Sequence, residues 1–210
     1  MELENFINDH KSNIIEYLFN GLTMMGQNNN NYITVWKEYE DQGCQLFLEY
    51  LKNNIEFSFI KAKSKSVYPE VIITLDGKNY AFDVKVSVDS QDPQYDIARL
   101  DTFEERMGKY TEEYEIVIKY NINHGVVSIY VEKVKDVIGF HRKSKGVKYR
   151  PYDGKIRPKT WDDFENNKTY FNTNEELLLG IKMSKIHRNK TLFETWKKEF
   201  SNEEMKKIIE

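Results

Sequence analysis

One pair of strands in this sequence carries the residue types that metal-assisted hydrolysis uses. Asp76-Gly77 separates two runs rich in β-branched residues, which is the strongest short-range signal for a β-hairpin. A two-residue turn at this point pairs the strands so that Glu70 lies directly opposite Asp83. Lys85 follows two residues later and therefore shares a face of the sheet with Asp83. We expect two carboxylates and one ammonium group to lie side by side.

The two opposed carboxylates indicate a bound divalent cation. Like charges at directly paired strand positions, with Cβ atoms only about 4.5–5.5 Å apart, destabilise a sheet. A cation between Glu70 and Asp83 would reverse that interaction, and Mg²⁺ prefers hard oxygen ligands while keeping places for water and phosphate oxygens. Lys85 would then lie where an ammonium group can position water or offset charge developing on a phosphoryl group. These residues predict metal-assisted hydrolysis of a phosphodiester.

The competing interpretation is an ordinary acid and lysine pair on a half-exposed strand. The pattern Asp/Glu-x-Lys occurs five times in the chain, so the tripeptide alone says little. Asp83 is the one case that lies inside an apolar strand with a second acid at the paired position. That context favours the catalytic interpretation.

A further acid comes from the helix expected between about Thr34 and Asn53. At 100° per residue its apolar positions fall on one face, and Glu40 lies within that face between Phe47 and Leu51. An acid inside an apolar stripe needs a cation or hydrogen bonds, and a metal site at the end of the neighbouring sheet would meet that need. The alternative places Glu40 at the edge of the stripe beside a lysine or arginine, and both interpretations stay open.

The other elements predict an α/β fold in which helices flank one central mixed sheet. Periodicity and turn residues place these elements along the chain. Their expected order is a helix over residues 1–27, a polar break at 28–31, a helix over 34–53, a strand over 55–60, the hairpin over 68–88, a helix within 92–113, a second hairpin over 114–134, and helices over 174–187 and 192–209, the last with a capping box at Ser201.

The stretch from Arg142 to Lys159 is the most basic part of the chain. Its eight cations and one acid give it a charge of +7, so the rest of the chain carries −10 of the total of −3. Aromatic residues interleave with the cations, and prolines and a glycine favour an extended loop that could contact phosphates and base edges. The alternative is a solvated loop that only raises solubility. The residues expected to bind DNA are Lys145, Lys148, Arg150, Lys155, Arg157 and Lys159.

Composition excludes several other classes of protein. The single cysteine, Cys44, rules out an internal disulfide framework and a multi-cysteine metal site. No segment approaches the run of about eighteen apolar residues that spans a bilayer, and the first residues lack the pattern of a secretion signal. We therefore expect a cytoplasmic protein with no membrane partner.

Pro69-Glu70, twelve intervening residues and then Asp83-Val-Lys85 resemble the PD-(D/E)XK nuclease superfamily, and most closely its type II restriction endonucleases. The matching part covers residues 34–134. The resemblance implies a restriction-endonuclease-like core, a central mixed β-sheet flanked by helices, to which this chain adds N- and C-terminal helices. It also implies one or two Mg²⁺ ions at the motif acids, and cleavage that leaves 5′-phosphate and 3′-hydroxyl ends.

Carried over to this chain, the resemblance makes Glu70 and Asp83 metal ligands and Lys85 the catalytic lysine. Some families of the superfamily add an acid from the preceding helix, for which Glu40 is the candidate. Glu70 stands where the motif has its first Asp. Its longer side chain leaves open whether it ligates directly or through water.

Together these observations predict a Mg²⁺-dependent endonuclease acting on double-stranded DNA, a type II restriction enzyme. A gene neighbour encoding a companion DNA methyltransferase would support that role. We expect a homodimer, because cleavage of both strands at a palindrome needs two active sites related by a two-fold axis. The alternatives are a structure-selective or repair nuclease resembling a junction resolvase, an RNA nuclease, and a DNA-binding module without catalysis. The expected single domain, 1–210, comprises a helical cap and linker (1–31), a catalytic core (34–134), a basic DNA-contacting loop (140–164) and C-terminal helices (172–210).

Overall fold

The fold is built on a five-stranded mixed β-sheet. The computed structural model describes residues 2–26, 35–63 and 68–199, and its strand order is β1-β2-β3-β5-β6. β3 and β5 run parallel, whereas the other neighbours run antiparallel. The expected mixed sheet is thereby confirmed. The strands are β1 (Ser58–Lys61), β2 (Val71–Leu75), β3 (Lys78–Val88), β5 (Glu112–Asn121) and β6 (Gly125–Lys133).

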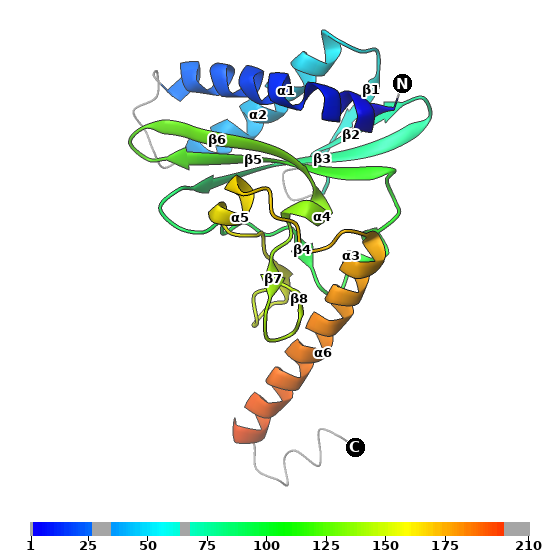
Figure 1. Ribbon diagram of the computed structural model, residues 1–210, viewed down its shortest axis with the longest axis vertical. Coiled ribbons are helices and arrows are strands. Elements are labelled where there is room, and N and C mark those ends of the chain that lie inside the picture. The colour runs from blue at the N-terminus through cyan, green and yellow to red at the C-terminus, as the bar shows by residue number, and fades with distance from the viewer. Residues whose placement is uncertain (1, 27–34, 64–67, 200–210) are drawn as a thin grey trace.

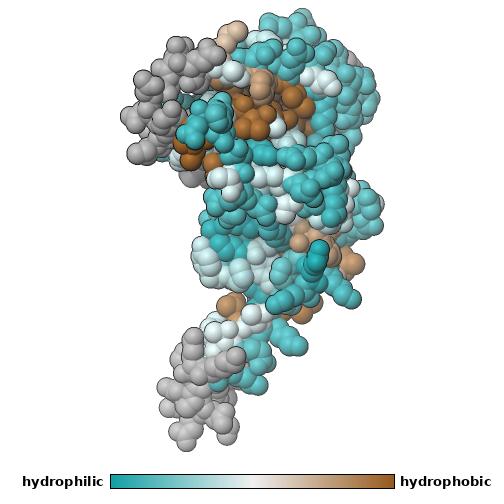
Figure 2. Space-filling view, turned by 60° about the vertical axis from the view of Figure 1, so that its left-hand side comes forward, coloured by the Kyte–Doolittle hydropathy of each residue, from teal (hydrophilic) through white to brown (hydrophobic). Residues whose placement is uncertain are grey.

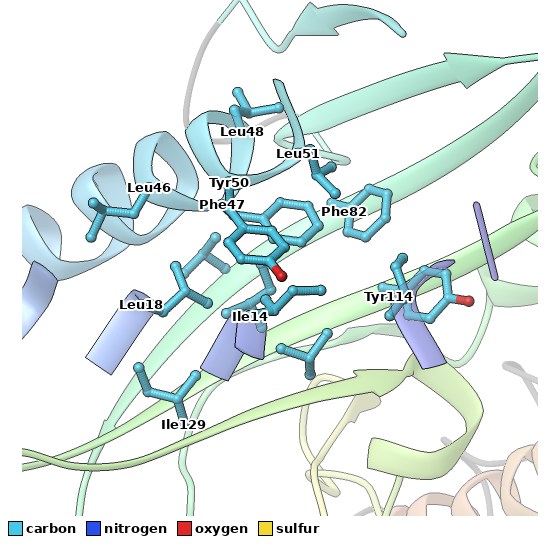
Figure 3. Packing of buried hydrophobic residues seen from close by; sticks show 14 of the residues in the cluster. Ile14, Leu18, Leu46, Phe47, Leu48, Tyr50, Leu51, Phe82, Tyr114 and Ile129 are labelled. Atoms are coloured by element: carbon cyan, nitrogen blue, oxygen red, sulfur yellow. The ribbon is translucent and has the colours of Figure 1, made fainter. Parts of the chain in front are cut away.

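Helices α1 (Leu3–Gly26) and α2 (Val35–Lys52) cover one face of the sheet (Figure 1). Their apolar sides pack on alternate strand residues, because successive strand side chains point to opposite faces. Phe82 of β3 lies within this core, with its ring centroid 4.9 Å from that of Phe47 on α2 and 5.1 Å from that of Tyr114 on β5 (Figure 3). Both helices agree with the sequence prediction.

The first hairpin has the predicted turn and register. Asp76 and Gly77 have φ angles of 50° and 75°, and a type I′ turn requires positive φ at both central positions. The antiparallel ladder continues down to the pair of Val71 and Phe82. After Phe82, β3 forms a ladder only with β5 among the described strands. The predicted pair of Glu70 with Asp83 is therefore not part of the ladder, and Glu70 lies one residue before β2, where the two strands separate.

A second apolar core covers the opposite face of the sheet (Figure 1). Leu100, Ile156 and Phe164 belong to this core together with the sheet residue Val117, and all four are buried. Short elements joined by loops supply these residues. They are β4 (Ala98–Arg99), α3 (Phe103–Arg106), α4 (Val134–Val137), β7 (Phe140–His141), β8 (Gly146–Val147), β9 (Lys155–Ile156), α5 (Trp161–Glu165) and α6 (Asn174–Glu199).

Two helix predictions are wrong. The helix expected within 92–113 is a single turn, α3, because the residues before it run across the second core and pair with β9. Within the described residues, the first helix expected after residue 174 and the start of the second form one continuous helix, α6, since no glycine or proline interrupts residues 181–199. The polar break at 28–31 and the capping box at Ser201 lie outside the described residues. None of the helices that the structure describes is both long enough and apolar enough to cross a membrane.

Candidate active site

Glu70, Asp83 and Lys85 meet beyond the β2–β3 ladder, just before β2 begins. The Nζ of Lys85 lies 2.6 Å from Oδ2 of Asp83. The backbone N–H of Val84, which is beyond the β2–β3 ladder, donates a hydrogen bond of 3.2 Å to Oε2 of Glu70. That bond holds the Glu70 carboxylate beside Asp83, which precedes Val84 in the chain. The structure therefore brings together the three residues that the hairpin pattern singled out.

Burial and repulsion between the acids set the electrostatics of this site. Asp83 is 4% exposed, and Glu70 and Lys85 are partly buried. Burial, reinforced by the negative charge of Asp83, raises the pKa of Glu70 to about 7. Burial disfavours the charged form of Lys85, yet the neighbouring carboxylates raise its pKa overall. The lysine is therefore an ammonium group at neutral pH.

Glu115 is an acid of this site that sequence reasoning missed. It is the direct partner of Asp83 in the parallel β3–β5 ladder. Its side chain is fully buried, and neither carboxylate oxygen has a hydrogen-bond partner among the described residues. Burial raises its pKa to about 7, against the opposing charge of Lys85. The available signal was an acid inside the apolar run from Tyr114 to Ile118, the same kind of signal that marked Asp83.

Glu40 lies on α2, the helix that packs against β3. It is partly buried, and its charge contributes to the raised pKa of Glu70. Cys44, one helical turn further on, is near the same acids: burial is the main cause that raises its pKa to about 11, with added contributions from Glu70 and Asp83. α2 therefore runs past the site as predicted, and a catalytic role for Glu40 stays a prediction.

The chemistry of these side chains fits a hard divalent cation. Glu70 and Asp83 offer two carboxylates, and Mg²⁺ is commonly held by one or two carboxylates while water and phosphate oxygens complete its coordination. In the described ranges no group of three acidic, histidine or cysteine side chains could enclose a metal ion by itself. The donors therefore suit a cation that shares its coordination with water and substrate.

The raised pKa values of Glu70 and Glu115 predict a pH-dependent stability. Both acids bind their protons more tightly in the folded chain, with pKa values of about 7 against an ordinary value of 4.5. Their contribution to the free energy of unfolding is therefore complete below about pH 4.5 and is lost as the pH rises to about 7. Urea unfolding of metal-free protein at about pH 5 and about pH 8 measures this loss. Glu70→Gln should reduce it, and a variant with the full wild-type pH dependence would contradict the prediction.

Three of the six predicted DNA-binding residues are engaged inside the protein. Arg150, Lys155 and Arg157 place side-chain nitrogens 3.6, 2.5 and 3.0 Å from carboxylate oxygens of Asp96. Arg150 also forms an ion pair with Asp153. These ion pairs hold the basic loop against the segment that follows β3.

The other three predicted DNA-binding residues differ in accessibility. Lys159 is 2% exposed, and its Nζ donates a hydrogen bond of 2.9 Å to the backbone carbonyl of Lys168. Lys145 is exposed and Lys148 partly buried, and neither side chain has an ion pair or hydrogen bond with the parts of the chain that the structure describes. Lys145 lies in the turn between β7 and β8, on the same side of the sheet as the second core (Figure 1). In Figure 2 an apolar patch lies in the upper part of the visible face, and hydrophilic side chains predominate across its middle.

Comparisons with known proteins bear on the fold. No family model matches the chain, and neither does any curated protein. Among solved structures, the NlaIV restriction endonuclease is similar, with a TM-score of 0.50 and 17% sequence identity over 70% of this chain and 64% of that chain. The chain thus matches less than two thirds of that protein's length. The similarity, together with the mixed sheet, confirms the predicted restriction-endonuclease-like fold.

Proposed function

We propose that this protein is a Mg²⁺-dependent endonuclease that hydrolyses phosphodiester bonds in double-stranded DNA. The observation that carries the proposal is the convergence of Glu70, Asp83 and Lys85, with the lysine 2.6 Å from one of two neighbouring acids. Their position on a fold shared with a restriction endonuclease supports the same conclusion. Such a set suits a reaction in which negative charge grows on a phosphoryl group.

Each residue has a role that follows from its chemistry. Glu70 and Asp83 would hold the cation through carboxylate oxygens. In that position the bound cation would polarise the phosphoryl group and lower the pKa of a water molecule. Lys85 keeps its proton, because neighbouring carboxylates raise its pKa despite burial, so it donates hydrogen bonds to water or phosphate oxygens. Glu40 remains the candidate for an additional acid from α2.

The biological role that we propose is that of a type II restriction enzyme working as a homodimer. One structural neighbour is a restriction endonuclease. A two-fold dimer would place one active site on each strand of a palindromic site. A companion DNA methyltransferase in the genome would protect that site in the host.

A substrate panel tests the proposed function. Unmethylated linear duplex DNA, a four-way DNA junction and single-stranded RNA are each incubated with the protein in Mg²⁺ and in chelator. We expect discrete fragments from the duplex in Mg²⁺ alone. Cleavage of the junction alone would favour a resolvase-like enzyme, and cleavage of RNA alone would favour a ribonuclease. Salt-sensitive duplex binding without any cleavage would favour a DNA-binding module.

We further propose that the turn between β7 and β8 contacts DNA phosphates. Its cations Arg142, Lys143 and Lys145 are exposed and have no ion pair within the described ranges, so binding DNA would break no internal ion pair. Replacing all three with Ala should weaken duplex binding and reduce the slope of log affinity against log salt by about 0.9 for each phosphate that is no longer neutralised. Fluorescence anisotropy in a salt series measures both effects. Lys52→Ala on α2 is the control, and a triple variant with the wild-type slope would exclude this surface.

A further inference from the structure

Glu115 is the buried acid that the proposed roles leave unused. It is paired with Asp83 in the β3–β5 ladder and with Glu132 in the β5–β6 ladder. Directly paired residues point to the same face of a sheet, so Asp83, Glu115 and Glu132 form one row. Glu115 therefore points to the face that carries Asp83 and Lys85.

The surroundings of Glu115 leave its oxygens without a hydrogen bond of normal geometry, although the Tyr95 hydroxyl is close by. Neither of its oxygens forms a hydrogen bond with a described residue, and the buried hydroxyl of Tyr95 also lacks one. The two groups are close: burial raises the pKa of Tyr95, and the Glu115 carboxylate raises it further through its charge and as an acceptor facing the hydroxyl. A buried carboxylate without a partner is unfavourable for folding, so its presence calls for a specific explanation.

Lys85 is the cation that most strongly opposes the raised pKa of Glu115. In the structure its Nζ lies against Asp83, the residue that we propose as a metal ligand. A carboxylate engaged by a cation is a weaker partner for an ammonium group, because its negative charge is already compensated. Glu115 is the adjacent carboxylate in the same row, and its oxygens accept no hydrogen bond of normal geometry from a described residue.

We propose that Glu115 is a positioning residue that offers Lys85 a second carboxylate, so that the ammonium group stays directed at the reacting phosphate while Asp83 is engaged. This inference rests on the proposed nuclease function. Glu115 itself touches neither substrate nor metal in this role. The Tyr95 hydroxyl lies beside the carboxylate.

Two measurements on Glu115→Gln test the inference, the melting temperature and the cleavage rate. If Glu115 had only a structural role, both would fall together. The melting temperature of the metal-free variant should rise by about 2–4 °C, because an unpartnered buried charge is removed. The single-turnover rate of duplex cleavage should fall by about 10–100-fold with unchanged DNA affinity. Glu115→Asp, which keeps the charge, should retain more of the rate than Glu115→Gln does.

Glu132→Gln is the matched control, because Glu132 is the next acid in the row and is ion-paired with Lys11 at 2.9 Å. This variant should keep the wild-type rate. A Glu115→Gln variant that cleaves at the wild-type rate would overturn the positioning role while leaving the nuclease function intact. A rate loss accompanied by an equivalent loss of thermal stability would overturn it as well, since that result indicates structural damage. If wild-type protein cleaves no substrate in the panel, the proposed function fails and this role fails with it.

Discussion

Replacing Asp83 with Asn should lower the rate of Mg²⁺-dependent DNA cleavage by roughly 10³-fold. The substitution weakens one of two carboxylate ligands and also removes the charge that pairs with Lys85 at 2.6 Å. The fold should survive, because removing the charge of Asp83 also removes a repulsion that disfavours the ionised form of Glu70. Single-turnover cleavage measures the rate, and thermal unfolding without metal checks the fold.

Asp92→Asn is the control for this prediction. Asp92 is an exposed acid in the segment that follows β3, outside the site. Its replacement should leave both the rate and the melting temperature unchanged. An Asp83→Asn variant that is folded and retains more than about a tenth of the wild-type rate would show that Asp83 is not a metal ligand.

Phe82→Ala should destabilise the protein by about 3–5 kcal/mol, which lowers its melting temperature by roughly 10 °C. The ring is 2% exposed and packs between Phe47 and Tyr114, so its removal leaves a cavity between α2 and the sheet. Urea unfolding measures the change in free energy. Ile60→Ala on β1 is the control, because Ile60 is 68% exposed and its loss creates no cavity. A loss below about 1 kcal/mol at Phe82 would mean that this core does not support β3 as described.

The hairpin could be predicted from the sequence because its determinants are local. Asp76 and Gly77 select the turn, and a two-residue turn sets the register that brings Glu70 to Asp83. Glu115 could not be placed in the same way. Its pairing with Asp83 depends on the register between β3 and β5, which are parallel strands joined by a long connection, and no turn fixes that register.

The basic segment shows a second limit of sequence reasoning. Local charge predicted that Arg150, Lys155 and Arg157 would be available to DNA. In the structure they surround Asp96, which is more than fifty residues earlier in the chain. Ion pairs between distant segments leave no periodicity or spacing that a single sequence could reveal. The DNA-binding role of these three residues stays a prediction, and Lys145 now offers the more accessible charge.

Cleavage of unmethylated duplex DNA by the wild-type protein, in Mg²⁺ and in chelator, tests the proposed chemistry at Glu70, Asp83 and Lys85 most directly. We expect discrete fragments in Mg²⁺ that DNA ligase can rejoin, since the expected ends carry 5′-phosphate and 3′-hydroxyl groups. We expect intact DNA in chelator. Intact DNA in both conditions, with protein that is folded and binds the duplex, would contradict a nuclease site at these residues.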